Sequence, residues 1–325
     1  MLNHYDYFIA LAEERSISKA AERLFISHQC LSKYLKNLEQ SYQIALFERK
    51  PHFQLTEAGK AYLDMLRQVQ LLEKNTENRM ADIRHSQEGL IRFGTTEGRY
   101  RVLIPQLISR YQKLYPDVRL ETYCATTNEL YERLEANQLD LVLLNFRDRH
   151  AARFETQTLL QETMYLVASD GLLAKYFPES YPECLETFRG GVDLAEFEQR
   201  RVPFVQTPVG FNSRDAVDEL CRRRGISLTL MLEMSQPDIH FLLCASSCVA
   251  SFCYSMYLPY VQTVGSLAGN DHLNVFPVQG LKAVNDVILA MPKGKILPAY
   301  GKGLIRLLRS VCKEYETGAK EPRRR

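Results

Sequence analysis

The length of 325 residues is enough for two or three domains, and a content of 46% hydrophobic and 25% charged residues is typical of a soluble globular protein. The formal net charge of +2 excludes a globally basic protein, so any binding of nucleic acid must rely on basic residues at local positions. The N-terminus lacks the basic and apolar regions of a signal peptide, which predicts a cytoplasmic protein.

Two features of the composition bear on cofactors and membranes. The eight cysteines include no CxxC pair, and none lies at zinc-ligand spacing from a histidine, so we expect no metal and no other cofactor. The stretch from Ile239 to Asn270 contains no Asp, Glu, Lys or Arg and is long enough to span a membrane. Its serines, with Gln262 and Pro259, favour a buried helix, turn and strand, so no membrane contact is expected.

The first 45 residues have the pattern of three short helices. The first helix ends near Arg15, and Ser16 can cap a second helix that runs from Ile17 to Leu24. Ser27 can cap a third helix, whose apolar stripe consists of Leu31, Leu35 and Leu38. The opposite face carries only hydrogen-bonding or basic side chains: His28, Gln29, Ser32, Lys33 and Lys36. This pattern favours a helix-turn-helix that reads the major groove, although a three-helix bundle with a solvated polar face remains an alternative.

A short basic hairpin follows the third helix. The residues from Leu46 to Pro51 lead into Phe53-Gln54-Leu55, and Thr56 can cap a further helix. A hairpin of this size is typical of the wing in winged-helix proteins, and Arg49 and Lys50 would contact the phosphate backbone.

These segments together resemble a known family. The run SISKAAERLFISHQCLSKYLKNLE, followed by LFER and LTEAG, resembles the DNA-binding domain of LysR-type transcriptional regulators over nearly all of residues 1–60. The resemblance implies that Gln29, Ser32, Lys33 and Lys36 face the major groove of double-stranded DNA and that Arg49 contacts the backbone. Two positions depart from the family pattern, since His28 replaces a common Gln and Gln43 replaces a common Gly. The predicted DNA-binding residues are Ser27, His28, Gln29, Ser32, Lys33, Lys36, Arg49 and Lys50.

A long helix is predicted from Glu57 to about Gln87. Its apolar residues alternate spacings of four and three, which is the pattern of a coiled coil: Ala58, Tyr62, Met65, Val69 and Leu72. A single apolar stripe on a long helix must be covered, either by the same chain or by a second copy. With the family resemblance, we predict a homodimer formed through this helix and pairing of dimers into a homotetramer. A dimer would place two recognition helices roughly 34 Å apart, on half-sites one turn of DNA apart.

The rest of the chain alternates strands and helices, which predicts an α/β fold with a doubly wound parallel sheet. The segments GTTEGRYRVLIP and YPDVRLE, and the Leu139-Asp140-Leu141 entry to a strand, resemble the two-lobed, periplasmic-binding-protein-like effector domain of the same family. The expected domains are a winged helix-turn-helix at 1–58, a linker helix at 59–88 and an effector-binding domain at 89–325. Within it, lobe 1 would span about 89–166 and 265–317, and lobe 2 about 167–264.

Polar residues at strand ends mark the expected ligand site, because ligands of such sheets lie beyond the carboxyl ends of strands. Hydroxyl and amide side chains at those positions also cap helices, which is the structural alternative for each single residue. Helix N-termini and hydroxyl groups suit a small anionic effector. The predicted effector-binding residues are Thr95, Thr96, Thr127, Asn145, Thr207 and Ser235.

Three other functions compete with a ligand-controlled regulator. An enzyme is not expected, because Walker, GxGxxG, GxSxG and HExxH motifs are absent. A solute-binding protein would share the two-lobed fold but would lack the winged helix. A redox-sensing regulator could use the closely spaced Cys244, Cys248 and Cys253, although buried packing residues explain these cysteines better.

Overall fold

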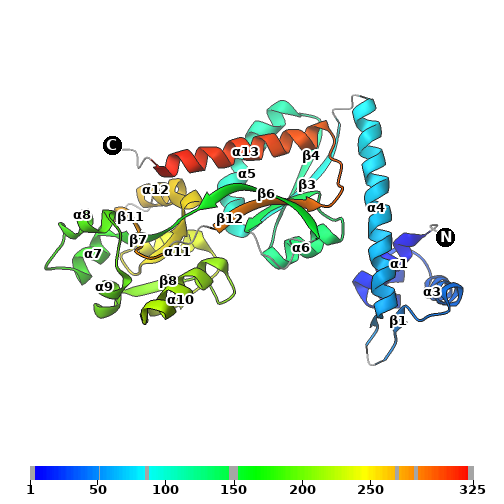
Figure 1. Cartoon of the computed structure of the whole chain (residues 1–325), viewed down its shortest axis with the longest axis horizontal. Helices are drawn as coiled ribbons and strands as arrows, with labels where there is room; N and C mark the ends of the chain where they lie inside the picture. Colours follow the sequence, from blue (N-terminus) through cyan, green and yellow to red (C-terminus); the bar gives the residue numbers. More distant parts are fainter. Residues whose placement is uncertain are drawn as a thin grey trace. The chain divides into compact units, whose positions relative to one another are not determined.

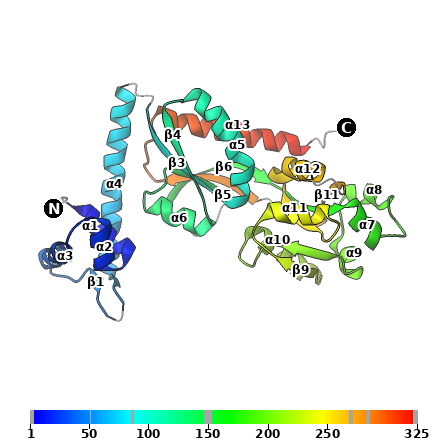
Figure 2. The same ribbon diagram turned by 180° about the vertical axis from the view of Figure 1, so that it is seen from behind.

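The computed structural model describes residues 4–50, 52–84, 88–145, 153–267, 271–281 and 285–320. The chain forms two compact units, of which the first comprises Met1–Arg84 with Glu135–Asn137 and the second comprises the rest (Figures 1 and 2). No helix in the described part of the chain is both long and apolar enough to cross a membrane.

The first unit contains the three predicted short helices, a hairpin and a long helix. Its elements are α1 (Tyr5–Glu14), α2 (Ile17–Arg23), α3 (His28–Tyr42), β1 (Phe47–Glu48), β2 (Gln54–Leu55) and α4 (Glu57–Ile83). The three predicted caps are confirmed: Ser16 accepts a hydrogen bond from the Lys19 amide, Ser27 from the Cys30 amide and Thr56 from the Gly59 amide. Each cap satisfies a backbone N–H that the first helical turn leaves without a partner.

The core of the first unit lies where α1, α2 and α3 meet the start of α4. Phe8, Leu11 and Leu31 are fully buried there, and the rings of Phe8 and Tyr62 meet edge-on with centroids 4.7 Å apart. Gly59 lets α4 approach the hairpin closely, because a Cβ at this position would lie 2.0 Å from the Leu46 carbonyl oxygen. The helix-turn-helix, the hairpin and the start of α4 therefore fold as one body.

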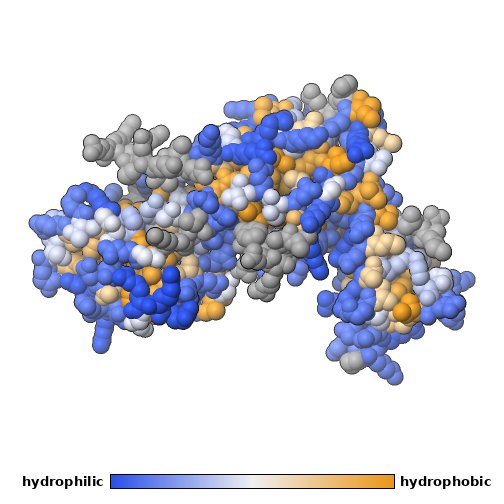
Figure 3. All heavy atoms as spheres, viewed as in Figure 1, coloured by the Kyte–Doolittle hydropathy of each residue, from blue (hydrophilic) through white to orange (hydrophobic). Residues whose placement is uncertain are grey.

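The long helix α4 has 27 residues, which corresponds to about 40 Å. Its first turns pack on the core, since Tyr62 and Leu66 are buried. Farther along, Leu72, Met80 and Ile83 are 65%, 51% and 76% exposed, and Figure 3 shows hydrophobic residues along α4. The predicted helix extended to about Gln87, but residues 85–87 lie outside the described part of the chain.

The first lobe of the second unit is built on a five-stranded sheet. The strand order is β4-β3-β5-β12-β6, in which β3 is parallel to β4 and β5, whereas β12 is antiparallel to both β5 and β6. Helices α5 and α13 pack on one face of the sheet, and α6 packs on the other (Figure 1). The bounds are β3 (Gly89–Thr95), α5 (Glu97–Leu114), β4 (Val118–Cys124), α6 (Thr127–Glu135), β5 (Leu141–Asn145), β6 (Phe154–Glu162), β12 (Asn285–Pro292) and α13 (Ala299–Lys320).

The second lobe contains a three-stranded antiparallel sheet, β10-β7-β11, and a parallel pair, β8-β9. The charge-free stretch from Ile239 to Asn270 supplies most of α11 and all of β10, in agreement with the predicted helix and strand, and also a second helix, α12, that was not predicted. The bounds are β7 (Met164–Ser169), α7 (Asp170–Tyr176), α8 (Cys184–Arg189), α9 (Leu194–Gln199), β8 (Pro203–Gln206), α10 (Asn212–Arg224), β9 (Thr229–Glu233), α11 (Pro237–Ala245), β10 (Ser251–Tyr254), a 3-10 turn (Ser255–Tyr257), α12 (Leu258–Leu267) and β11 (Leu273–Pro277).

One lobe boundary differs from the sequence-based expectation. The return to lobe 1 was expected near residue 265, but β11 pairs with β7 in the sheet of the second lobe. The chain joins the first sheet again only at β12, which pairs with β5 and β6. The difference arises because strand partners depend on tertiary contacts, which the local sequence of β11 does not specify.

Candidate functional site

The exposed face of α3 carries the predicted DNA-reading residues. Leu31 and Leu35 are buried against the core, whereas His28, Gln29, Lys33 and Lys36 are exposed and Ser32 is half-buried. The Ser27 side chain caps the helix, 3.1 Å from the Cys30 amide. The structure thus brings together one polar and basic helix face without an acidic residue at its N-terminal end.

A carboxylate joins this helix to the hairpin, and the sequence-based prediction did not include it. Glu39, in α3, accepts hydrogen bonds from the backbone amides of Leu46 at 2.9 Å and Phe47 at 3.2 Å. Its second oxygen lies 3.2 Å from an Arg49 guanidinium nitrogen. The Arg49 side chain remains 63% exposed, and Lys50 is exposed as well. Glu39 therefore holds the base of the hairpin and the predicted phosphate-contacting arginine in a fixed relation to α3.

The residue that ends α3 has a left-handed backbone conformation. Gln43 has a φ of 53°, in the left-handed region that glycine adopts without a steric penalty. A side chain in this conformation costs roughly 1 kcal/mol relative to glycine. The turn between α2 and α3 contains a second such residue, Phe25, with a φ of 55° and a side chain that is 96% exposed.

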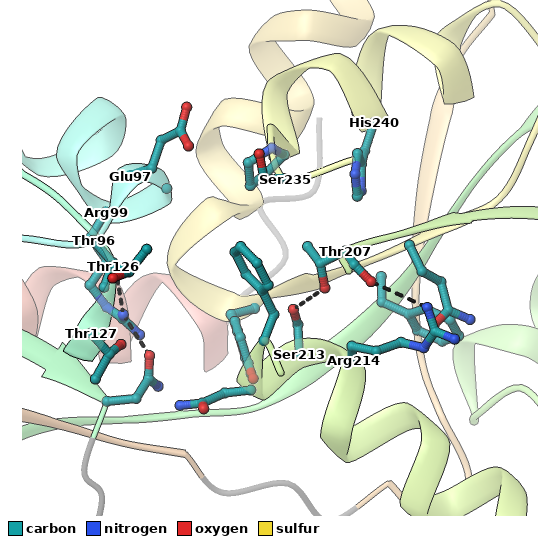
Figure 4. A pocket seen from close by; sticks show the side chains of 18 of the residues that line it. Thr96, Glu97, Arg99, Thr126, Thr127, Thr207, Ser213, Arg214, Ser235 and His240 are labelled. Carbon is teal, nitrogen blue, oxygen red and sulfur yellow. Dashed lines mark hydrogen bonds between the residues drawn. The ribbon is translucent and has the colours of Figure 1, made fainter. Parts of the chain in front are cut away.

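A cavity of about 540 Å³ lies in the second unit, lined by residues from both lobes. The first turns of α5, α6, α10 and α11 contribute to its wall. In Figure 4, Thr96, Arg99, Thr126 and Thr127 lie on one side and Thr207, Ser213 and Arg214 on the other. Five of the predicted effector-binding residues line this cavity: Thr96, Thr127, Asn145, Thr207 and Ser235.

Thr95 is the exception among the predicted residues. It is fully buried, is not part of the cavity lining, and donates a hydrogen bond to the Leu143 carbonyl at 2.7 Å. Successive residues at a strand end point to opposite sides, so Thr95 faces the core while Thr96 reaches the cavity. The prediction for Thr95 is wrong in this respect.

The first-lobe wall contains a buried ionic network. Arg99 is 2% exposed, forms an ion pair with the fully buried Glu162, and donates hydrogen bonds to Asn145 Oδ1 at 2.8 Å and Thr96 Oγ1 at 3.2 Å. Burial raises the pKa of Glu162, and the adjacent guanidinium opposes that rise. The arginine charge is thus neutralised within the wall.

The second-lobe wall combines hydroxyl groups with another paired arginine. The hydroxyl oxygens of Thr207 and Ser213 lie 2.8 Å apart. Arg214 donates to the Thr207 carbonyl at 3.3 Å and pairs with the carboxylates of Asp218 and Glu233. Both arginines that line the cavity therefore have carboxylate partners.

His240 is a buried histidine in the wall of the cavity. Its Nε2 lies 2.9 Å from the Met234 carbonyl oxygen, so this nitrogen carries a proton, and its Nδ1 lies 3.1 Å from the Ser251 hydroxyl. Burial lowers the pKa of His240. The ring is thus neutral near pH 7, held by two polar contacts.

Comparison with known proteins identifies the family. The model of the LysR substrate binding domain matches residues 84–313, and that of the bacterial regulatory helix-turn-helix protein, lysR family, matches residues 2–60. The chain belongs to the LysR family of transcriptional regulators. It is thus a DNA-binding regulator with an effector-binding domain, as the resemblance in the sequence predicted.

Relatives of this LysR-type regulator are regulators themselves. It is 26% identical to the HTH-type transcriptional regulator CysL of Bacillus subtilis (strain 168), over 70% of this chain and 72% of CysL. It is 28% identical to the probable RuBisCO transcriptional regulator of Porphyra purpurea, over 71% of this chain and 69% of that protein. Two solved structures share the fold. A full-length OxyR variant from Pseudomonas aeruginosa has a TM-score of 0.65 and 20% identity, and the match covers 96% of this chain and 94% of that one. Full-length CbnR in complex with its target DNA has a TM-score of 0.55 and 20% identity, and the match covers 95% of this chain and 99% of that one.

The sequence-based prediction missed several cavity residues of this LysR-type regulator. Arg99 lies within the segment GTTEGRYRVLIP, one helical turn after Thr96, and this spacing could have suggested that it faces the same site. The lining residues His240 and Ser213 gave no comparable signal, and neither did Glu162, which lies behind the wall as the partner of Arg99. Their proximity to the cavity depends on contacts between elements far apart in the chain.

The cysteines do not form an obvious redox site. Cys244 and Cys253 are buried, and burial raises the pKa of both thiols, which disfavours the reactive thiolate. Cys248 is exposed. In the described residues, no group of three or more His, Cys, Asp or Glu side chains could hold a metal ion.

Proposed function

We propose that this regulator is a cytoplasmic homodimer, assembled further into a homotetramer, that reads DNA with the exposed face of α3. Gln29, His28 and Ser32 contact base edges in the major groove, whereas Lys33 and Lys36 attract phosphates. Arg49 and Lys50 contact the backbone from the hairpin. The observation that carries the proposal is the exposed polar and basic face of α3, fixed to the hairpin by Glu39.

The proposed dimer forms through α4. Leu72, Met80 and Ile83 leave an apolar stripe exposed on one chain, and a second α4 would cover it. A two-fold dimer presents two recognition helices to a site with approximate dyad symmetry.

The proposed control is a small molecule in the cavity between the lobes, at Thr96, Thr127, Asn145, Thr207 and Ser235. An anionic group suits the helix N-termini in its wall. Ligand binding shifts the angle between the lobes if the two lobe arrangements bind the ligand with different affinity. We propose no catalytic role for the cavity.

The experiment is footprinting of the full chain on DNA from upstream of its own gene, with excess competitor DNA. Lys36→Ala should weaken binding to all sequences and reduce the slope of log affinity against log salt by about 1. Gln29→Ala should relax the preference at one base pair. Lys113→Ala removes the same charge from an exposed position of α5 and serves as the control. No protected site at low salt, or equal losses for all three variants, would contradict the proposal.

A further inference from the structure

We propose that the hydrogen bond from Tyr5 in α1 to Glu73 in α4 fixes the angle between the DNA-reading helix and the dimer helix, and so sets the spacing of the two DNA half-sites that the dimer accepts. The inference rests on the proposed dimer through α4. Tyr5 and Glu73 are positioning residues, because neither belongs to the exposed face of α3 that reads DNA.

Glu73 lies on the side of α4 that packs on α1. Tyr62 and Leu66 of this helix are buried in the core of the first unit, and Glu73 follows them by about three and two helical turns. Leu66 is the last buried apolar residue of α4. The contact between Glu73 and Tyr5 therefore lies about 10 Å farther along the helix than the hydrophobic core.

The Tyr5 hydroxyl is suited to hold this carboxylate. It donates a hydrogen bond to Glu73 Oε2, across 68 positions of sequence. This bond is the main cause that raises the pKa of Tyr5 to about 12, with partial burial and the charge of Glu73 adding to it. The hydroxyl therefore keeps its proton at neutral pH, and a hydrogen bond to a charged acceptor is stronger than one between neutral groups.

The helix that carries Tyr5 is joined firmly to the DNA-reading helix. Arg23 of α2 forms ion pairs with Glu13 and Glu14 of α1, at 2.7 and 3.1 Å. Phe8 of α1 and Leu31 of α3 are buried in the same core. A contact that fixes the angle between α1 and α4 therefore also fixes the angle between α3 and α4.

A small displacement at Glu73 has a larger effect at the far end of α4. Glu73 lies about 10 Å beyond Leu66, whereas Ile83, in the apolar stripe of the proposed dimer, lies about 25 Å beyond it. A shift of about 1 Å at Glu73 thus tilts the helix by roughly 6° and moves its end by about 2.5 Å. Successive base pairs are about 3.4 Å apart. Loss of the contact would therefore let the dimer accept spacings that differ by a base pair.

The first test measures the distance between the two recognition helices of the full-length dimer without DNA. A ketone-directed spin label on p-acetylphenylalanine, in place of Gln40 at an exposed position of α3, leaves the native cysteines unmodified. In pulsed electron–electron double resonance, Tyr5→Phe should broaden the distribution of this distance by at least about 2-fold. An unchanged distribution would overturn the proposal.

Two further variants serve as controls. Glu73→Gln keeps an acceptor oxygen and should preserve the distribution. Tyr7→Phe removes a hydroxyl group from the same helix, one that has no hydrogen-bond partner among the residues that the structure describes, and it should have no effect. Broadening by Tyr7→Phe equal to that by Tyr5→Phe would contradict the role of the Tyr5 hydroxyl. Circular dichroism checks that each variant is folded.

A spacing series provides a readout that a purely structural defect would not move. The duplexes carry the site protected in footprinting, with from two fewer to two more base pairs between its halves. The ratio of affinities for the preferred spacing and for one extra base pair should fall by at least about 3-fold in Tyr5→Phe, and by less than about 2-fold in Glu73→Gln and Tyr7→Phe. Equal loss of affinity at every spacing would refute the positioning role.

Sedimentation of the full chain separates this inference from the proposed function. A monomer would refute the proposed dimer and the spacing role together. A dimer whose helix-to-helix distance does not respond to Tyr5→Phe would refute only the role of Tyr5 and Glu73.

Discussion

Replacing Arg99 with methionine is expected to destabilise the second unit strongly. The substitution leaves Glu162 fully buried without its counter-ion, and it removes the donors to Asn145 and Thr96. Removing one partner of a buried ion pair typically costs about 3–5 kcal/mol. For a domain of this size that cost corresponds to a fall of roughly 6–20 °C in the unfolding temperature.

The double variant distinguishes this explanation from a simple packing defect. Arg99→Met combined with Glu162→Leu removes both charges, so most of the loss should be recovered. Differential scanning calorimetry of the full chain measures the transition of the second unit in each variant. A single-variant decrease below roughly 3 °C, or a double variant less stable than Arg99→Met, would refute the reasoning.

Four further expectations follow from individual contacts. Glu39→Ala removes acceptors from two backbone amides and from Arg49, so DNA affinity in a filter-binding assay should fall while the dimer, measured by sedimentation, persists. Gln43→Gly relieves the left-handed conformation and should raise the unfolding free energy of the first unit by up to about 1 kcal/mol in denaturant titrations; an unchanged midpoint would contradict the strain. Burial lowers the pKa of His240 in the folded protein below its unfolded value of about 6.5. The unfolded state therefore takes up a proton more readily as the pH falls below about 6.5. The free energy of unfolding should decrease there by up to about 1.4 kcal/mol per pH unit. His240→Gln should flatten this pH dependence. Because burial raises the pKa of Cys244, peroxide should leave this thiol free, as shown by mapping the modified cysteines with a thiol reagent after unfolding.

The sequence by itself determined the local elements and which face of α3 is exposed. Ser16, Ser27 and Thr56 cap the helices at the predicted positions, because a cap needs only a hydroxyl group and an amide within the same turn. The periodicity of Leu31 and Leu35 likewise predicted which side of α3 is buried, since helical geometry alone sets that spacing.

The tertiary structure decided the partners that lie far apart in the chain. Arg99 and Glu162 are separated by 63 positions and meet only when β6 joins the first sheet, and Glu39 receives the hairpin amides only when the chain turns back on α3. Thr95 and Thr96 are chemically alike and adjacent, yet one faces the core and the other the cavity. The local sequence pattern determines which residues share a helix face. Which side chains meet across a sheet or between lobes depends instead on strand register and packing, because the whole fold sets the distances between residues far apart in the chain.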